Sequence, residues 1–118
     1  YFLFVNLYFL GSFSSSLSIF YSNNLLDSEF IPHIQNPVIV DPRFSRSAGR
    51  IIHVGGKLVR PAQQSIDRYG EALHFLEIDL TRDYFSWHLR QTLPLPKGWY
   101  GIHHYDSAGE LGSIDYLS

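Results

Sequence analysis

The sequence predicts an all-β protein, and three observations point to that class. Short apolar segments recur about every 8–12 residues, with clusters of Gly, Ser, Asn and Asp between them. No stretch of about eleven residues shows a convincing helical repeat. Aromatic residues make up 16% of the chain, and aromatic side chains favour strands. About eight short strands fit a sandwich, a barrel or a propeller, and the pattern alone does not choose among them.

The expected strands begin with the apolar run at residues 1–10, which ends at Gly11-Ser12. Pro32 and Pro37 exclude a helix from residues 30–40, which we expect to be extended. Further along, apolar and polar residues alternate in a way typical of strands. The remaining expected strands are residues 17–22, 49–54, 57–62, 71–79, 84–90, 99–106 and 111–117.

The clearest local signal is Gly55-Gly56 between two apolar-rich segments. Two-residue hairpin turns need positive φ at both central positions, which glycine adopts readily. Such a turn places Val54 opposite Lys57 and, further from the turn, Arg50 opposite Pro61 and Ile51 opposite Arg60. Arg50 and Arg60 then fall on different faces of the hairpin.

Bulk composition narrows the function classes. The chain has 118 residues, enough for one small domain, and a net charge of −2, so no overall field attracts nucleic acid or an anionic membrane. Cysteine is absent, which excludes disulfides and thiolate metal sites. The first apolar run is too short for a membrane span and lacks the features of a signal peptide. Because methionine is absent and the chain opens inside an apolar run, we expect a fragment of a longer protein.

Positive charge is concentrated in one segment. Five of the nine Lys and Arg residues lie between Arg46 and Arg68, where Asp67 is the only acid. One interpretation is a solvated hairpin whose arginines pair with nearby acids. The other is an anion- or polyol-binding rim, since guanidinium groups bind carboxylates, phosphates and vicinal hydroxyls. The candidate substrate-binding residues are Arg46, Arg50, Arg60, Gln63, Arg68 and Tyr69.

Residues 17 to about 80 resemble the N-terminal domain of plant glucosamine inositolphosphorylceramide transferase and its bacterial relatives. The departures from that pattern are Ser47, Val59 and Gln64. The residues that carry the resemblance are Phe20-Tyr21-Ser22, Pro32-His33, Asn36-Pro37-Val38, Asp41, Arg43, Arg46, Ala48-Gly49-Arg50, Arg60-Pro61-Ala62-Gln63 and Arg68-Tyr69-Gly70.

The resemblance implies about two blades of a five-bladed β-propeller related to family-43 glycoside hydrolases. Residues 1–40 would form one blade, and residues 41–118 the next blade with closing strands. The expected partners are a sugar or glycolipid head group, bound at the propeller axis, and the remaining blades of the parent protein. No cofactor, nucleic acid or membrane span is expected. A plant-like member would lie in the Golgi lumen, and otherwise the compartment is undetermined.

Catalysis by this segment is not expected, although the parent protein is a candidate glycosyltransferase or glycosidase. Glycoside hydrolysis needs two carboxyl groups across the scissile bond, and in the related enzymes these lie on earlier blades. Asp41 and Glu71 are the in-chain candidates, and each has a simpler interpretation. Asp41, before Pro42, would form a turn, and Glu71 would pair with Arg68 or start a strand. His103 is a weak candidate metal ligand, because His104 must point to the opposite face. Two alternatives stay open: the C-terminal part of a glycosidase, and a purely structural or partner-binding propeller.

Overall fold

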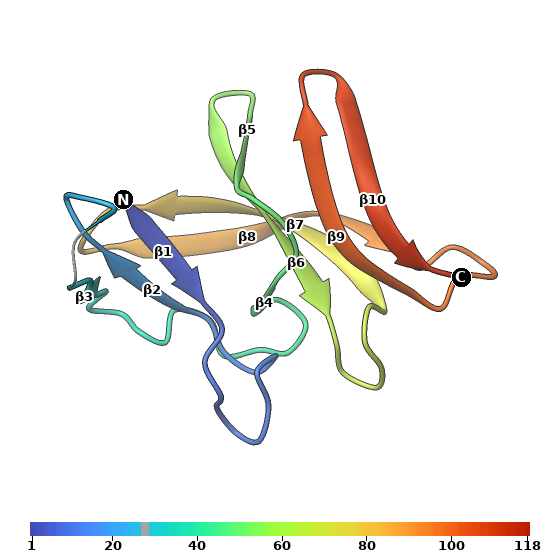
Figure 1. The fold of residues 1–118 in the computed structure, drawn as a ribbon, viewed down its shortest axis with the longest axis horizontal. Helices are drawn as coiled ribbons and strands as arrows, with labels where there is room; N and C mark the ends of the chain where they lie inside the picture. The colour runs from blue at the N-terminus through green and yellow to red at the C-terminus, as the bar shows by residue number, and fades with distance from the viewer. Residues whose placement is uncertain (27–28) are drawn as a thin grey trace.

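The computed structural model describes residues 1–26 and 29–118, and its described residues contain strands and no helix. Ten strands form three antiparallel sheets that follow one another along the chain (Figure 1). The strands are β1 (Phe2–Val5), β2 (Ser18–Tyr21), β3 (Ile31–Pro32), β4 (Arg46–Ser47), β5 (Ile52–Val54), β6 (Lys57–Gln64), β7 (Ala72–Leu80), β8 (Phe85–Pro94), β9 (Gly101–Ala108) and β10 (Leu111–Leu117).

The first sheet, in the order β1-β2-β3, depends on two asparagine side chains. The Asn36 amide donates to the Ile19 carbonyl oxygen at 2.7 Å and accepts from the Ile19 amide at 2.8 Å, so it replaces a strand partner. Asn6, just after β1, donates to the carbonyl oxygens of Ser16 and Ser45 at 2.8 Å each. Its own oxygen accepts from the Ser47 amide at 3.0 Å. Asn6 therefore joins the first sheet to β4.

The second sheet has the order β4-β6-β7-β8, with β5 pairing the same edge of β6 as β4. The hairpin at Gly55 and Gly56 is confirmed: both have positive φ, at 58° and 75°, and Val54 pairs with Lys57. The register expected further from the turn is wrong. β5 begins at Ile52 and β4 ends at Ser47 opposite Ala62, so Arg50 is not paired with Pro61 and Ile51 is not paired with Arg60.

Pro61 explains this interruption. The Pro61 carbonyl oxygen accepts from the Ala48 amide at 3.2 Å, which shows that the backbone N and C=O of Pro61 face the β4–β5 edge. Proline has no N–H to offer there, so a regular partner strand would be left with an unpaired carbonyl. The Ala48 carbonyl oxygen, which would face the missing N–H, accepts from the Tyr105 amide instead, and Arg50 is free of the strand pairing expected for it.

The third sheet is the β9–β10 hairpin, which packs against the second sheet through two glycines. The Tyr105 amide donates to the Ala48 carbonyl oxygen at 2.8 Å, and the Ile102 amide donates to the Gly70 carbonyl oxygen at 2.9 Å. A Cβ on Gly70 would lie 2.7 Å from the Ile102 nitrogen, and one on Gly49 would overlap the Tyr105 carbonyl oxygen. Both glycines have positive φ, so backbone conformation and close approach each require glycine.

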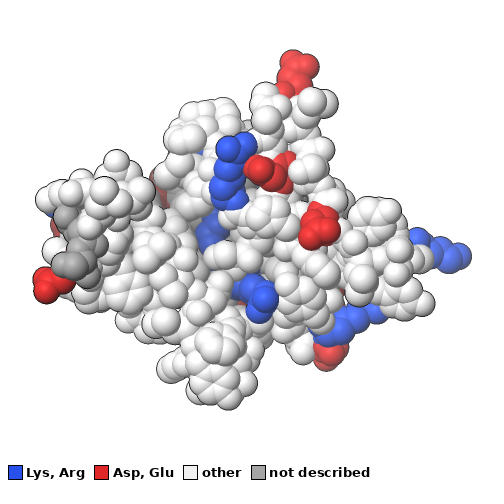
Figure 2. All heavy atoms as spheres, viewed as in Figure 1, with Lys and Arg blue, Asp and Glu red and all other residues white. Residues whose placement is uncertain are grey.

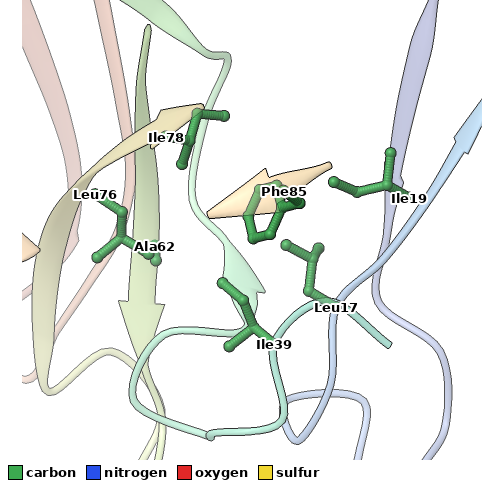
Figure 3. Close-up of a cluster of buried hydrophobic side chains, with 7 residues drawn as sticks. All are labelled: Leu17, Ile19, Ile39, Ala62, Leu76, Ile78 and Phe85. Carbon is green, nitrogen blue, oxygen red and sulfur yellow. The ribbon is translucent and has the colours of Figure 1, made fainter. Parts of the chain in front are cut away.

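Two apolar clusters hold the three sheets together. The larger lies between the first and second sheets, where Phe85 of β8 faces Leu17 and Ile19 on one side and Ile78 on the other (Figure 3). The smaller joins the second and third sheets through Ala48, Leu73 and Ile102. The first sheet lies within residues 1–40 and the other two within residues 41–118. No helix of the described residues is long and apolar enough to cross a membrane.

The all-β prediction is confirmed, whereas the propeller stays a prediction. The three sheets are separate, and the described strands form no closed ring. The order of the sheets along the chain, with the second between the other two, is an arrangement that a propeller also has.

We expect Gly49→Ala to destabilise the fold far more than Gly98→Ala. Both positions have positive φ, which costs an L-residue about 1–2 kcal/mol, but a Cβ at Gly98 meets open space. The overlap with Tyr105 should add about 1–3 kcal/mol at Gly49. Urea unfolding of the two variants measures the difference. Equal losses would show that β9 does not need the close approach at Gly49.

Candidate functional site

Arg60, a predicted binding residue on β6, is buried instead of lying at a rim. Its side chain is 1% exposed. Nη1 donates to the Phe44 carbonyl oxygen at 2.8 Å, and Nη2 donates to the Ser45 carbonyl oxygen at 2.5 Å and to the Ser47 hydroxyl at 3.1 Å. Burial lowers the pKa of the guanidinium to about 9, so the group is still charged at neutral pH. Arg60 therefore fixes the path of the chain from Phe44 to Ser47.

Arg46 and Tyr69 do come together, as their prediction in one site requires. Arg46 on β4 pairs with Gln63 on β6, and its guanidinium carbon lies 4.8 Å from the centre of the Tyr69 ring. Nη1 donates to the Ser14 hydroxyl at 3.3 Å and Nη2 to the Tyr69 hydroxyl at 3.4 Å. The Tyr69 side chain is 49% exposed. We call Ser14, Arg46, Tyr69 and His103 the Arg46–Tyr69 patch.

His103 completes this patch from β9. Its ring meets the Tyr69 ring edge-on, with the centres 4.6 Å apart. The Nε2 atom of His103 is buried and has no hydrogen-bond partner among residues 1–26 and 29–118. Adjacent His104 is exposed, as the strand alternation predicts. Within the same described residues, no group of three or more His, Cys, Asp or Glu side chains is arranged to hold a metal ion.

Gln63 is buried next to the patch and links the segments that carry its residues. It is 1% exposed, and its amide is satisfied when the nitrogen donates to the His103 carbonyl oxygen at 3.2 Å. In that orientation the oxygen accepts from the Ser65 hydroxyl at 3.1 Å and from the Gly70 amide at 3.0 Å. Gln63 is therefore a positioning residue that joins β6, β9 and the loop that carries Tyr69.

Glu71, a weak catalytic candidate, holds the same loop. Its Oε1 accepts from the amides of Ile66, Asp67 and Arg68 at 2.7, 2.7 and 3.0 Å, and its Oε2 accepts from Gln64 at 2.9 Å. Partial desolvation raises the pKa of this carboxyl, but these hydrogen bonds lower it more, and the net shift is downward. Glu71 acts as a loop clamp one residue before β7, through the backbone amide of Arg68 and not through an ion pair with its side chain.

Asp41 has a similar local role. Its carboxylate accepts from Arg43 Nη2 at 2.6 Å, and that side-chain hydrogen bond holds the pKa of Asp41 below its usual value. Its backbone carbonyl oxygen accepts from the amides of Phe44 and Ser45. Asp41 therefore forms the turn expected of it, and both candidate carboxylates are engaged by local partners.

The side chains of two other predicted binding residues, Arg50 and Arg68, form no hydrogen bond with the residues of the patch. Arg50 Nε is 2.6 Å from the Asp106 carboxylate, and Nη2 donates to the Ser107 carbonyl oxygen. Arg68 is exposed, and its guanidinium forms no ion pair with the residues that the structure describes. Figure 2 shows separate basic groups near the centre of one face, with acidic groups beside some of them and one set in a recess.

Arg50 and Arg60 share a second feature, a hollow of about 340 Å³ between β1 and the segment after β4. It is lined by Phe2, Phe4, Ser47, Gly49, Arg50, Ile51 and Arg60. Five of the six predicted residues thus divide between two places: Arg46, Tyr69 and Gln63 at the patch, and Arg50 with Arg60 at the hollow. Arg68 belongs to neither. Sequence reasoning missed Ser14 and Asn6. Asn6 had a visible signal, since it is an amide inside an apolar run.

In comparisons with protein-family models, with curated proteins and with solved structures, no match to this chain was found.

We expect Arg60→Met to lower the free energy of unfolding by about 3 kcal/mol, because it leaves the Phe44 and Ser45 carbonyl oxygens without their charged donor. Arg50→Met is the matched control, since its exposed ion pair with Asp106 should contribute about 1 kcal/mol or less. Urea denaturation of both variants gives the comparison. An Arg60→Met protein as stable as the parent would remove the organising role assigned to Arg60.

Acid should loosen the Tyr69 loop through Glu71. A carboxyl whose pKa is lowered by folding stabilises the fold above its unfolded value, and this contribution is lost as the pH falls through the folded value. Between about pH 6 and about pH 3, the parent protein should therefore lose more stability than Glu71→Gln. Denaturation midpoints at the two pH values test this. Identical losses would show that Glu71 does not clamp the loop.

Proposed function

We propose that this chain is a carbohydrate-binding segment of a β-propeller, in which the Arg46–Tyr69 patch binds a sugar or glycolipid head group. The parent protein would be associated with glycosyl transfer, as the motif resemblance implies. The observation that carries the proposal is the pairing of a half-exposed tyrosine with a guanidinium that its surroundings hold in place.

The chemistry of the patch fits hydroxyl-rich ligands. Arg46 has five N–H donors in a fixed plane, and the contacts with Ser14 and Tyr69 engage two of its three nitrogens. Its remaining donors suit vicinal hydroxyls, while an exposed aromatic ring offers an apolar surface to the C–H face of a sugar. Because Ser14, Tyr69 and Gln63 restrict the side chains around the patch, little conformational entropy is lost on binding.

The same contacts support binding more than catalysis. Asp41 and Glu71 are each satisfied by local donors, so neither is poised as a general acid or a nucleophile toward a ligand at the patch. We therefore propose that the segment binds or orients a head group and that any reaction takes place elsewhere in the parent protein.

Ligand-detected NMR with glucosamine, glucuronate and myo-inositol 1-phosphate tests the proposal. We expect at least one of these probes to bind, with affinity falling about 10- to 100-fold in Arg46→Ala, as the loss of charged hydrogen bonds implies. Tyr69→Phe should weaken binding less than Tyr69→Ala, because it keeps the ring.

The matched control is Arg82→Ala. Arg82 lies over the Tyr21 ring at 5.4 Å and so forms a second arginine–tyrosine pair, outside the patch. Binding should survive in this variant. Folded Arg46→Ala protein that binds every probe as well as the parent would contradict the proposed site and favour a structural propeller.

A further inference from the structure

The hollow lined by Arg60 raises a question that the patch does not answer. Arg60 is 1% exposed and positively charged, yet its three hydrogen-bond acceptors are two carbonyl oxygens and one hydroxyl. Among residues 1–26 and 29–118, no carboxylate forms an ion pair with it. A buried charge without a counter-charge is costly, so the site favours an anion from outside the described chain.

A second observation points the same way. The Nε of Arg60 is buried and has no hydrogen-bond partner within the described part of the chain. Buried N–H groups almost always have an acceptor, and one that lacks it calls for an explanation. A water molecule would satisfy the N–H but would leave the charge uncompensated. An anionic oxygen would satisfy both.

The walls of the hollow define the rest of the ligand. Ser47 accepts a hydrogen bond from Arg60, and its own O–H donates to no described residue, so it offers a second donor. Phe2 and Phe4 are two residues apart on β1 and therefore share a face, which gives the hollow an apolar wall. Its volume of about 340 Å³ is at the small end of the range for ligand pockets.

Arg50 lines the hollow but adds little net charge. Its guanidinium is bound to the Asp106 carboxylate and to the Ser107 carbonyl oxygen. Arg60 thus carries the positive charge at the hollow that has no counter-charge, and a ligand with one negative charge neutralises it. A carboxylate, with two oxygens for two donors, fits better than a group of higher charge.

We propose that the hollow between β1 and the segment after β4 is a binding site for a small carboxylate with a flat or apolar body. The carboxylate accepts from Arg60 Nε and the Ser47 hydroxyl, and the body of the ligand packs against Phe2 and Phe4. This site is separate from the Arg46–Tyr69 patch and does not rest on the function proposed for it.

Benzoate and benzamide are the probes that test the proposal, because they share a ring and differ in charge. We expect benzoate to bind the 118-residue chain about tenfold more tightly than benzamide, as the difference between charged and neutral hydrogen bonds implies. Benzoate should also shift the assigned side-chain Nε–H NMR signal of Arg60. Glucuronate is a third probe, which has a carboxylate but no aromatic ring. If it also binds in the hollow, the carboxylate is the group that is recognised. If it binds more weakly than benzoate, the apolar wall favours a ligand with an aromatic body.

Variants at the wall keep the test independent of the core. Ser47→Ala and Phe2→Ala should each weaken benzoate binding about three- to tenfold, since each removes one contact of moderate strength. Arg43→Ala is the control, because Arg43 pairs with Asp41 and does not line the hollow. Tyr69→Ala should leave benzoate binding unchanged, which separates this site from the patch. An unmoved Arg60 Nε–H signal at saturating benzoate, or equal affinity for benzamide, would overturn the proposal.

Discussion

The hydrogen bonds from the Arg60 guanidinium to the carbonyl oxygens of Phe44 and Ser45 determine how the rest of the molecule is arranged. They hold the chain just before β4 against β6, and a third hydrogen bond from the same guanidinium binds the Ser47 hydroxyl in β4. That placement sets Arg46 beside Tyr69 and Arg50 beside Asp106. An apolar side chain of similar size has no donors for these carbonyl groups. A lysine has its donors on one nitrogen and lacks the planar guanidinium that reaches several acceptors at once. A single buried cation therefore lies beneath both of the proposed binding surfaces.

The sequence predicted the elements of this fold better than the contacts between them. Glycines at positions 55 and 56 and the alternation on either side were enough to place the hairpin, because turn chemistry and strand period are local properties. The gap in pairing between β4 and β5 was missed. Pro61 was visible in the sequence, but the edge of β6 that its backbone faces depends on the neighbouring strands. The burial of Arg60 was also missed. Arginine is rarely fully buried, and periodicity gives a face of a strand without saying what covers it.

The motifs that carry the resemblance have clear structural roles. Asn36 takes the place of a strand partner for Ile19, and Gly49 and Gly70 admit the backbone of β9. Arg60 and Gln63 satisfy backbone groups in the interior. Each of these residues would be required whatever the protein binds, so these positions bear on the architecture and not on the ligand. Arg46 and Tyr69 differ from them in being exposed to an outside molecule, and so the proposed function depends on these two.

Gly70 has a mechanical consequence. It directly follows Tyr69, its carbonyl oxygen accepts the Ile102 amide, and its missing side chain leaves no slack between the loop and β9. Beside that hairpin Trp99 stacks on Tyr116, with the ring centres 3.9 Å apart. The indole ring of Trp99 therefore offers an optical signal from the hairpin against which the Tyr69 loop is packed.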